Sequence, residues 1–332
     1  MKISQPYFFN EIGKRLNQED SVYPVHPSGN DNLFMVCDGM GGHEYGEVAS
    51  SVVCESIASF FKTANKENFS IDMFKRALAF AYDELDKQGD ASETKGVMGT
   101  TLTFLYLASS KAYIAHIGDS RVYHIRTAEG QSYIINKTFD HSLVNELLRD
   151  GIITEEEAAS HPNKNIITRA VQPVPAKRCE ADFYVADDIV AGDYFFLCSD
   201  GVLESISDDL LIEILSEDAA DSDKLDKIKE LCRNGSRDNN SAYLIHIEDI
   251  EHSNAAQQRD FKGAERVEIQ DNNPIVRKSK QSSPLHQVSN ISGWKKSLGM
   301  WKYIIPIVIL VIIVCFLLYK FGYIPIEIKL HK

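Results

Sequence analysis

Four aspartates stand where apolar, strand-like segments begin or end. Asp38, Asp119 and Asp200 follow the segments FMVC, YIAHIG and YFFLCS, and Asp238 precedes NNS and the segment AYLI. A single aspartate in such a place is usually a turn residue, because its side chain hydrogen-bonds nearby backbone groups. Four of them, each beside Gly, Ser or Asn, predict one shared site to which distant parts of the chain contribute.

Carboxylates gathered at one site repel each other unless cations lie between them. This set offers oxygen ligands without His or Cys partners, so it favours a hard ion, Mg²⁺ or Mn²⁺, over zinc or copper. Two such ions about 3.5–4 Å apart can activate a water molecule and neutralise the oxygens of an in-line displacement at phosphorus. The residue types therefore suggest hydrolysis of a phosphate ester without a covalent enzyme intermediate.

The residues next to these aspartates fit the same chemistry. Gly39 leaves its backbone carbonyl open to a metal, and Gly41 and Gly42 allow a tight strand-to-helix turn. A nucleotide-binding loop is the competing interpretation of DGMGGHEYG, but the G-x-G-x-x-G spacing is absent. Arg15 precedes NQED, and its planar guanidinium suits two oxygens of a phosphate ester, although alone it would be an ordinary surface charge.

Seven short motifs follow one another along roughly the first 248 residues. They are R-x-x-x-E-D at 15–20, DGMGGH at 38–43, GTT at 99–101, GDSR at 118–121, DHS at 140–142, SDG at 199–201 and DN at 238–239. In kind and order they resemble the signature blocks of the type-2C metal-dependent Ser/Thr protein phosphatases. The DGMGGH form resembles the bacterial branch of that family.

The resemblance implies a metal site of two or three ions of Mn²⁺ or Mg²⁺. By motif, Asp38, Asp200 and Asp238 would ligate the first ion, and Asp38 with the Gly39 carbonyl the second. Asp119, together with Asp200, matches the place of the weaker third metal of the bacterial enzymes. The alternative for Asp119 is a structural turn.

Other roles also come from the resemblance. Glu19 and Asp20 would hold metal-bound waters, and Arg15 would bind the phosphate of the substrate. Animal members are thought to use a His directly after the DG as a general acid, whereas this chain has Met40 there and His43 three residues later. His43 could donate the proton to the leaving group, or it could cap the following helix.

The strand and helix patterns suggest antiparallel sheets with helices packed on their outer faces, and the resemblance implies an α+β fold, a sandwich of two antiparallel β-sheets flanked by α-helices. Helical spacing of apolar residues predicts helices over 46–62 and 71–88. Tight turns at 108–111 and 118–121 predict that the strands on either side of each turn pair in antiparallel fashion. The predicted strands cover residues 32–37, 100–107, 111–117, 121–125, 133–135, 194–198 and 242–247.

The chain divides into four predicted parts. Residues 1–248 form the phosphatase domain, in which 145–171 match the flap beside the cleft of the family, with a packed helical hairpin as the alternative. Residues 249–302 form a flexible polar and basic linker. Residues 303–321 form one C-terminal transmembrane helix, and 322–332 a short tail.

The membrane prediction rests on the uncharged run IIPIVILVIIVCFLL between Lys302 and Lys320. Its length is close to the roughly 17–25 residues that a helix needs to cross a bilayer, and aromatic residues gather at both ends. Lys295 and Lys296 favour a cytoplasmic position for the preceding chain, and no secretory signal peptide opens the sequence. We therefore expect a single-pass protein of the cell (inner) membrane with a cytoplasmic catalytic domain.

Composition limits the partners. The formal net charge is −13, with the acidic residues concentrated before the linker, so nucleic acid is not an expected partner. The 6 cysteines are scattered without a zinc-type spacing, which indicates reduced thiols. The expected partners are proteins phosphorylated on Ser or Thr, among them a membrane-bound Ser/Thr kinase or its substrates. The alternatives are a catalytically inactive, membrane-tethered phosphoprotein-binding module and a metallohydrolase of small phosphate esters.

Overall fold

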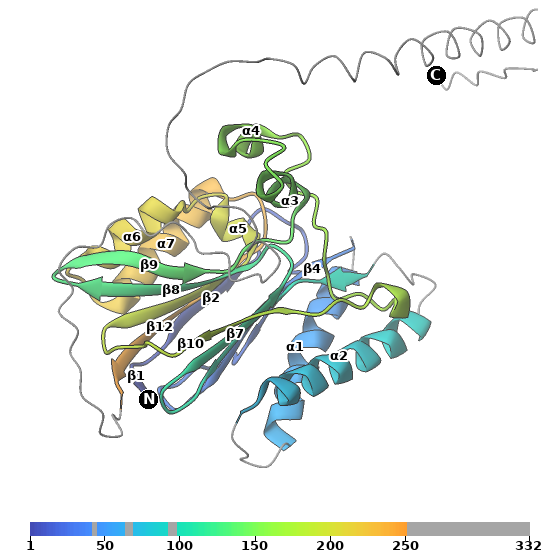
Figure 1. The fold of residues 1–332 in the computed structure, drawn as a ribbon, viewed down its shortest axis with the longest axis horizontal. Coiled ribbons are helices and arrows are strands. Elements are labelled where there is room, and N and C mark those ends of the chain that lie inside the picture. Colours follow the sequence, from blue (N-terminus) through green and yellow to red (C-terminus); the bar gives the residue numbers. More distant parts are fainter. Residues whose placement is uncertain (42–44, 64–68, 92–97, 251–332) are drawn as a thin grey trace, which may run out of the picture. The chain divides into compact units, whose positions relative to one another are not determined.

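Two six-stranded antiparallel β-sheets lie face to face in the computed structural model of the chain (Figure 1). The structure describes residues 1–41, 45–63, 69–91 and 98–250. One sheet comprises β1 (Lys2–Ile3), β2 (Tyr7–Glu11), β8 (Arg121–Ala128), β9 (Gln131–Lys137), β11 (Asp193–Cys198) and β12 (Asn240–Asp249). The other comprises β3 (Asp20–Tyr23), β4 (Leu33–Met40), β5 (Gly99–Thr100), β6 (Leu102–Leu107), β7 (Ala112–Ile117) and β10 (Asp182–Ala186). The predicted sandwich is confirmed.

Strands β4 and β11 are apolar on both faces along most of their length, because each sheet is covered on both sides. Along β4, Met35 faces the helices while Phe34 and Val36 face the other sheet. Along β11, Phe195 packs between the sheets and Phe196 packs outward. This alternation follows from the two-residue period of a strand. The result is three apolar layers, one between the sheets and one beneath each group of helices.

Helices cover the outer face of each sheet. The β4 sheet is covered by α1 (Tyr45–Thr63) and α2 (Ile71–Ala91), which match the predicted helices closely. The β11 sheet is covered by α5 (Asp200–Leu203), α6 (Asp208–Ser216) and α7 (Asp221–Gly235). Ser207 caps α6 by accepting a hydrogen bond from the backbone N–H of Leu210. The order of layers is helix, sheet, sheet, helix (Figure 1).

The prediction of antiparallel pairing holds at one of the two tight turns and is wrong at the other. Strands β6 and β7 on either side of residues 108–111 do pair, with Leu107 opposite Ala112. The turn at 118–121 instead carries the chain from one sheet to the other, since β7 pairs with β6 and β10 while β8 pairs with β9 and β11. Gly118 makes this crossing with a positive φ of 103°. A short turn thus separates two strands of different sheets.

The segment that matches the family's flap contains two short helices, α3 (Leu143–Arg149) and α4 (Glu155–Ser160), at one end of the sandwich (Figure 1). Ser142 caps α3, and Thr154 with Glu157 forms a capping box on α4. An isolated bridge between Ser142 and Ile167 closes the base of the segment. The segment thus contains two capped helices, and its role as a flap stays a prediction.

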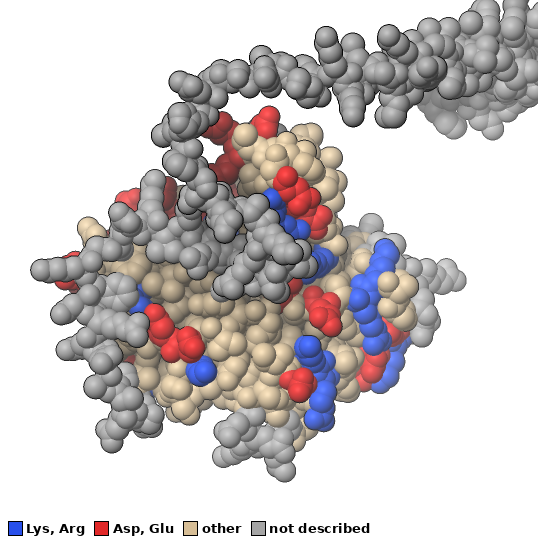
Figure 2. Space-filling view, viewed as in Figure 1, with Lys and Arg blue, Asp and Glu red and all other residues tan. Residues whose placement is uncertain are grey.

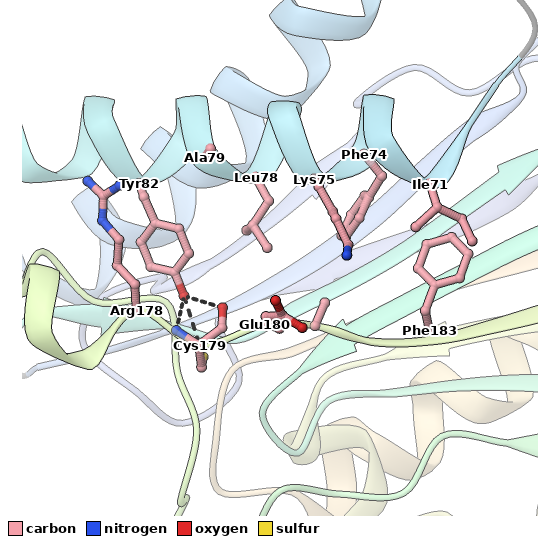
Figure 3. Close-up of a pocket in the computed structure, with 11 residues that line it drawn as sticks. Ile71, Phe74, Lys75, Leu78, Ala79, Tyr82, Arg178, Cys179, Glu180 and Phe183 are labelled. Carbon is pink, nitrogen blue, oxygen red and sulfur yellow. Dashed lines mark hydrogen bonds between the residues drawn. The ribbon is translucent and has the colours of Figure 1, made fainter. Parts of the chain in front are cut away.

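A cavity of about 210 Å³ separates α2 from the chain that leads into β10 (Figure 3). Phe74, Leu78 and Tyr82 line it from the helix. The Tyr82 hydroxyl lies 3.2 Å from both the backbone nitrogen and the carbonyl oxygen of Cys179, which joins the two walls. Over α2, basic and acidic side chains lie near one another (Figure 2), and Arg178 bonds Asp83 and Asp86 there.

The predicted linker, from residue 251 onward, and the predicted transmembrane helix at 303–321 lie outside the described residues. Among the helices that the structure does describe, none combines the length and apolar character needed to cross a membrane. The membrane anchor therefore stays a prediction from the sequence.

Candidate active site

The fold brings five aspartates from separate elements to one end of the sandwich. Asp20 opens β3 directly opposite Asp38 near the end of β4. Asp119 lies in the turn between β7 and β8, Asp200 opens α5 after β11, and Asp238 immediately precedes β12. The two sheets and the crossing between them thus all contribute, as the positions at strand ends predicted. Asp20 thus joins the four aspartates identified from strand ends.

Burial and mutual repulsion make this cluster electrostatically unfavourable. Burial, followed by the charges of Asp200 and Asp20, raises the pKa of Asp38 well above its usual range. Burial is also the main cause that raises the pKa of Asp20 to about 7 and that of Asp119 to about 8, with the charge of Asp200 contributing to both. Carboxyl groups with raised pKa values hold protons that a cation could replace.

Several oxygens of the cluster point into the protein without a partner. Oδ1 of Asp20, of Asp119 and of Asp200 is buried and accepts no hydrogen bond. A buried polar atom without a partner costs free energy, so it indicates a missing ligand or strain. Carboxylate oxygens are the donors that Mg²⁺ and Mn²⁺ prefer. The residues present therefore fit hard divalent cations.

Two serines fix the orientation of Asp20. Its Oδ2 accepts hydrogen bonds from Ser199 Oγ at 2.8 Å and from Ser241 Oγ at 2.7 Å. Both serines belong to the β11–β12 side of the sandwich, so Asp20 ties that sheet to β3. Both hydrogen bonds go to Oδ2, so Oδ1 stays buried without a hydrogen-bond partner. Ser241 was not identified from the sequence, where it is one polar residue within an apolar strand.

Arg15 lies at the rim of the cluster. Its guanidinium donates to Asp238 Oδ2 at 2.5 Å, with 56% of the arginine side chain exposed. The hydrogen bond and charge of Asp238 raise the pKa of Arg15 further above its usual value. The exposed remainder of the guanidinium leaves donors available to a phosphate arriving from solvent, which is the position that the sequence prediction requires.

Close backbone packing explains Gly39. A Cβ at Gly39 would lie 2.1 Å from the carbonyl oxygen of Gly46 and 2.5 Å from that of Glu19. The Gly39 N–H donates to the Glu19 carbonyl at 3.0 Å, and the Glu19 carboxylate lies against Gly46. Glu19 is therefore placed beside the cluster by the β3–β4 pair and by the start of α1. His43 lies outside the described residues, so its predicted role stays untested.

Two residues that the sequence motifs contained without an assigned role hold the site together. Thr101 Oγ1 accepts from the Asp38 backbone N–H at 2.9 Å and bonds Ser120 Oγ at 2.8 Å, so it joins β4 to the turn of Asp119. Asn239 Oδ1 accepts from the Glu19 backbone N–H at 2.8 Å. The sequence pointed to Thr101 and Asn239 only through their places in the GTT and DN motifs. Their roles could not be predicted, because they depend on contacts between distant segments of the chain.

The cavity beneath α2 is a different place. None of its lining residues belongs to the aspartate cluster, and its walls are mostly apolar. Its lining includes one carboxylate, Glu180, together with the cations of Lys75 and Arg178, so it offers no cluster of ligands for a hard cation. The aspartates predicted from the sequence to bind cations lie elsewhere, at one end of the sandwich.

Comparison with known proteins gives a consistent result. Residues 10–220 match the family described as protein phosphatase 2C. Protein phosphatase PhpP of Streptococcus pneumoniae is 33% identical over 237 residues, which cover 70% of this chain and 93% of PhpP. The crystal structure of the Mycobacterium tuberculosis serine/threonine phosphatase PstP/Ppp is similar with a TM-score of 0.65 and 31% identity, covering 75% of this chain and 100% of that one.

A further structure is the catalytic domain of the serine/threonine protein phosphatase PstP in complex with two manganese ions. It is 29% identical, has a TM-score of 0.63 and covers 75% of this chain and 100% of that one. The helix–sheet–sheet–helix layers and the carboxylate cluster thus define a phosphatase of a metal-dependent class. The chain belongs to the protein phosphatase 2C family and is a serine/threonine protein phosphatase.

Proposed function

We propose that this phosphatase hydrolyses phosphoserine and phosphothreonine of proteins with a water activated by two divalent cations, Mn²⁺ or Mg²⁺, held by the aspartate cluster. The observation that carries the proposal is the set of buried Oδ1 atoms of Asp20, Asp119 and Asp200 that have no partner. The two manganese ions in the PstP catalytic domain support the number and kind of cations.

The proposed roles fall to three groups of residues, namely cation ligands, residues that orient water and a phosphate-binding arginine. Asp38, Asp200 and Asp238 would hold the cations, with the Gly39 carbonyl as a further ligand, and Asp119 would add a third, weaker position. When bound, two such cations supply an activated water and positive charge at the reacting phosphorus. Glu19 and Asp20 orient the surrounding waters, and Arg15 binds the phosphate oxygens from the rim.

The activity test uses the full-length chain in detergent with a phosphothreonine peptide and with p-nitrophenyl phosphate. We expect turnover of both with Mn²⁺ and none with EDTA. Asp38→Asn should lower the rate by at least about a thousandfold, since it removes a charge from both cation positions. Asp218→Asn, which alters an exposed aspartate between α6 and α7, is the matched control and should leave the rate unchanged.

Three results would contradict the proposal. Full activity in EDTA would exclude the cation mechanism. Binding of the phosphopeptide without turnover under any metal would favour the inactive binding module. Nucleotides turned over far faster than the phosphopeptide would favour a metallohydrolase of small phosphate esters.

We also propose that residues 303–321 anchor the enzyme in the membrane, so that it acts on phosphoproteins near the cytoplasmic face, such as a membrane-bound Ser/Thr kinase or its substrates. The apolar run between Lys302 and Lys320 supports this. The full-length chain should remain in carbonate-washed membranes, whereas a chain lacking residues 294–332 should be released. An unchanged cellular pattern of dephosphorylation after that deletion would contradict the role of the anchor.

A further inference from the structure

A second polar cluster lies next to the aspartate site. His116 on β7, His141 just before α3 and Asp182 at the start of β10 place one ligand atom each within 4.8 Å of one another. The imidazole rings of the two histidines stack, with centroids 4.5 Å apart. Two buried histidines and a carboxylate are residue types that bind zinc. The hydrogen bonds decide whether they can do so here.

The ring of His141 has no free nitrogen for a metal. The backbone N–H of Gly118 donates to His141 Nδ1 at 3.1 Å, so Nδ1 carries no proton. The proton of the neutral ring is then on Nε2, which lies 3.2 Å from Asp182 Oδ2. Arg169 donates to Asp182 Oδ1 at 2.8 Å and lies 3.3 Å from Nε2. A cation placed beside Nε2 would be repelled by the proton on that nitrogen and by the guanidinium of Arg169.

These bonds instead hold Gly118 through both of its peptide groups. His141 accepts the Gly118 N–H through its ring, and its own backbone N–H donates to the Gly118 carbonyl at 2.9 Å. Gly118 also packs closely against Thr101, since a Cβ there would lie 2.6 Å from Thr101 Cγ2. The next residue along the chain is Asp119, whose side chain is buried with Oδ1 unpartnered. The direction of that carboxylate depends on how the Gly118 peptide is held.

A second contact ties the same two segments together. Arg121 forms a two-pronged bond to Asp140, with Nε–Oδ1 and Nη2–Oδ2 both at 2.7 Å. Such paired bonds fix geometry as well as charge. The contact holds the chain two residues beyond Asp119, while His141 holds the residue before it.

We propose that His141 is a positioning residue for the cation site: its imidazole fixes the Gly118 peptide so that Asp119 faces Asp38 and Asp200, and Asp182 keeps the imidazole in the required tautomer. The hydrogen bond from His141 also holds the pKa of Asp182 well below its usual range, which keeps this acceptor ionised. The inference rests on the proposed function, because its effect is on cation binding through Asp119. Substitution of a residue that orients a metal ligand typically lowers metal affinity 10–100-fold.

The test compares two substitutions in the full-length chain in detergent. In His141→Asn the amide oxygen can occupy the position of Nδ1 and accept the Gly118 N–H, whereas in His141→Gln the amide reaches only the position of Nε2. Mn²⁺ binding is measured by electron paramagnetic resonance of the free ion, together with the Mn²⁺ dependence of p-nitrophenyl phosphate turnover. We expect His141→Gln to weaken the Asp119-dependent Mn²⁺ by about tenfold and His141→Asn to stay within about threefold of wild type.

Asp182→Asn tests the tautomer without entering the core, since the Asp182 side chain is 54% exposed. It removes the ionised acceptor from Nε2–H and should weaken Mn²⁺ in the same direction as His141→Gln, by about threefold. Melting temperatures recorded in EDTA show whether each variant is folded. A purely structural role would lower the melting temperature in EDTA and leave the Mn²⁺ affinity of the folded fraction unchanged, which would overturn the inference.

The background variant Asp119→Asn separates the remaining outcomes. The weakening caused by His141→Gln should disappear in that background, because the carboxylate that it positions is gone. Persistence of the effect there would overturn the inference, as would one stoichiometric Zn²⁺ per wild-type chain that both His141 variants lose. A wild-type chain that binds Mn²⁺ with these differences but hydrolyses no phosphoester would refute the proposed function and leave the inference standing.

Discussion

Asp119→Asn should stabilise the cation-free protein, and adding Mn²⁺ should reduce that gain. Burial and the charge of Asp200 raise the pKa of Asp119 from 3.8 to about 8. An acid whose pKa is higher in the folded chain than in the unfolded chain lowers stability as the pH rises from the unfolded value to the folded value. The contribution of Asp119 to stability is thus most favourable below about pH 4 and becomes progressively less favourable up to about pH 8.

The size of the effect follows from the same shift. Each pKa unit corresponds to about 1.4 kcal/mol, so at pH 7, about three units above the unfolded value, Asp119 costs on the order of 4 kcal/mol of the free energy of unfolding. Asparagine has nearly the same shape and no charge, so in EDTA the variant should recover up to that amount at pH 7 and nothing at pH 4. In Mn²⁺ that advantage should shrink, because the wild type alone gains about 2.7 kcal/mol from a cation at the Asp119 position when the cation is at a hundred times its dissociation constant.

Chemical unfolding followed by far-ultraviolet circular dichroism measures both effects. Tryptophan fluorescence is unsuitable, since both tryptophans, at 294 and 301, lie outside the described domain. The matched control is Asp218→Asn, which should change stability in neither buffer. A lower free energy of unfolding for Asp119→Asn than for the wild type at pH 7 in EDTA would refute this prediction. A difference between the two free energies that does not change with pH would refute it as well.

Three further predictions concern the scaffold. Gly118→Ala should destabilise the fold by more than about 2 kcal/mol and lower Mn²⁺ affinity, because the new methyl clashes with Thr101; an unfolding curve and a Mn²⁺ titration matching wild type would contradict it. Asp193→Ala should cost about 3–5 kcal/mol, since Arg126 would lose its buried partner, and because the pKa of Asp193 is lowered, this contribution should fade as the pH falls through that pKa in urea titrations. Tyr82→Phe should cost about 1 kcal/mol and leave phosphatase turnover unchanged; a large loss of turnover would show that the α2 cavity is coupled to the site.

Strong periodic patterns made much of the fold predictable. The helix predicted at 71–88 is α2 (Ile71–Ala91), and the strand predicted at 194–198 is β11 (Asp193–Cys198). Short elements were missed, such as β3 and β10, because four or five residues give too little period to recognise. Helix α7 was missed although Leu225, Ile228 and Cys232 recur at helical spacing, since the charged residues between them dominate its composition.

The residue types of the site could be predicted from the sequence. The contacts that position those residues could be predicted much less well. Strand-end positions identified the carboxylates because charge beside buried strands is unusual. The crossing at Gly118 could not be told from a hairpin, since the sequence of a turn does not state which sheet receives the next strand. His141 appeared in the DHS motif, but its role depends on a bond to the Gly118 peptide, which only tertiary structure supplies.

The distribution of the site over both sheets explains how the chain tolerates a crowded cluster. Asp38 is held by one sheet and Asp200 by the other, so separating the sheets would relieve the repulsion between them. The layer between the sheets opposes that movement with large, fully buried side chains such as Phe34, Phe195 and Tyr243. Burying one such aromatic side chain contributes about 2–3 kcal/mol, so a few of them offset the cost of on the order of 4 kcal/mol for Asp119. The apolar core thus holds the carboxylates together before any cation binds, and the cation gains affinity from the repulsion that it removes.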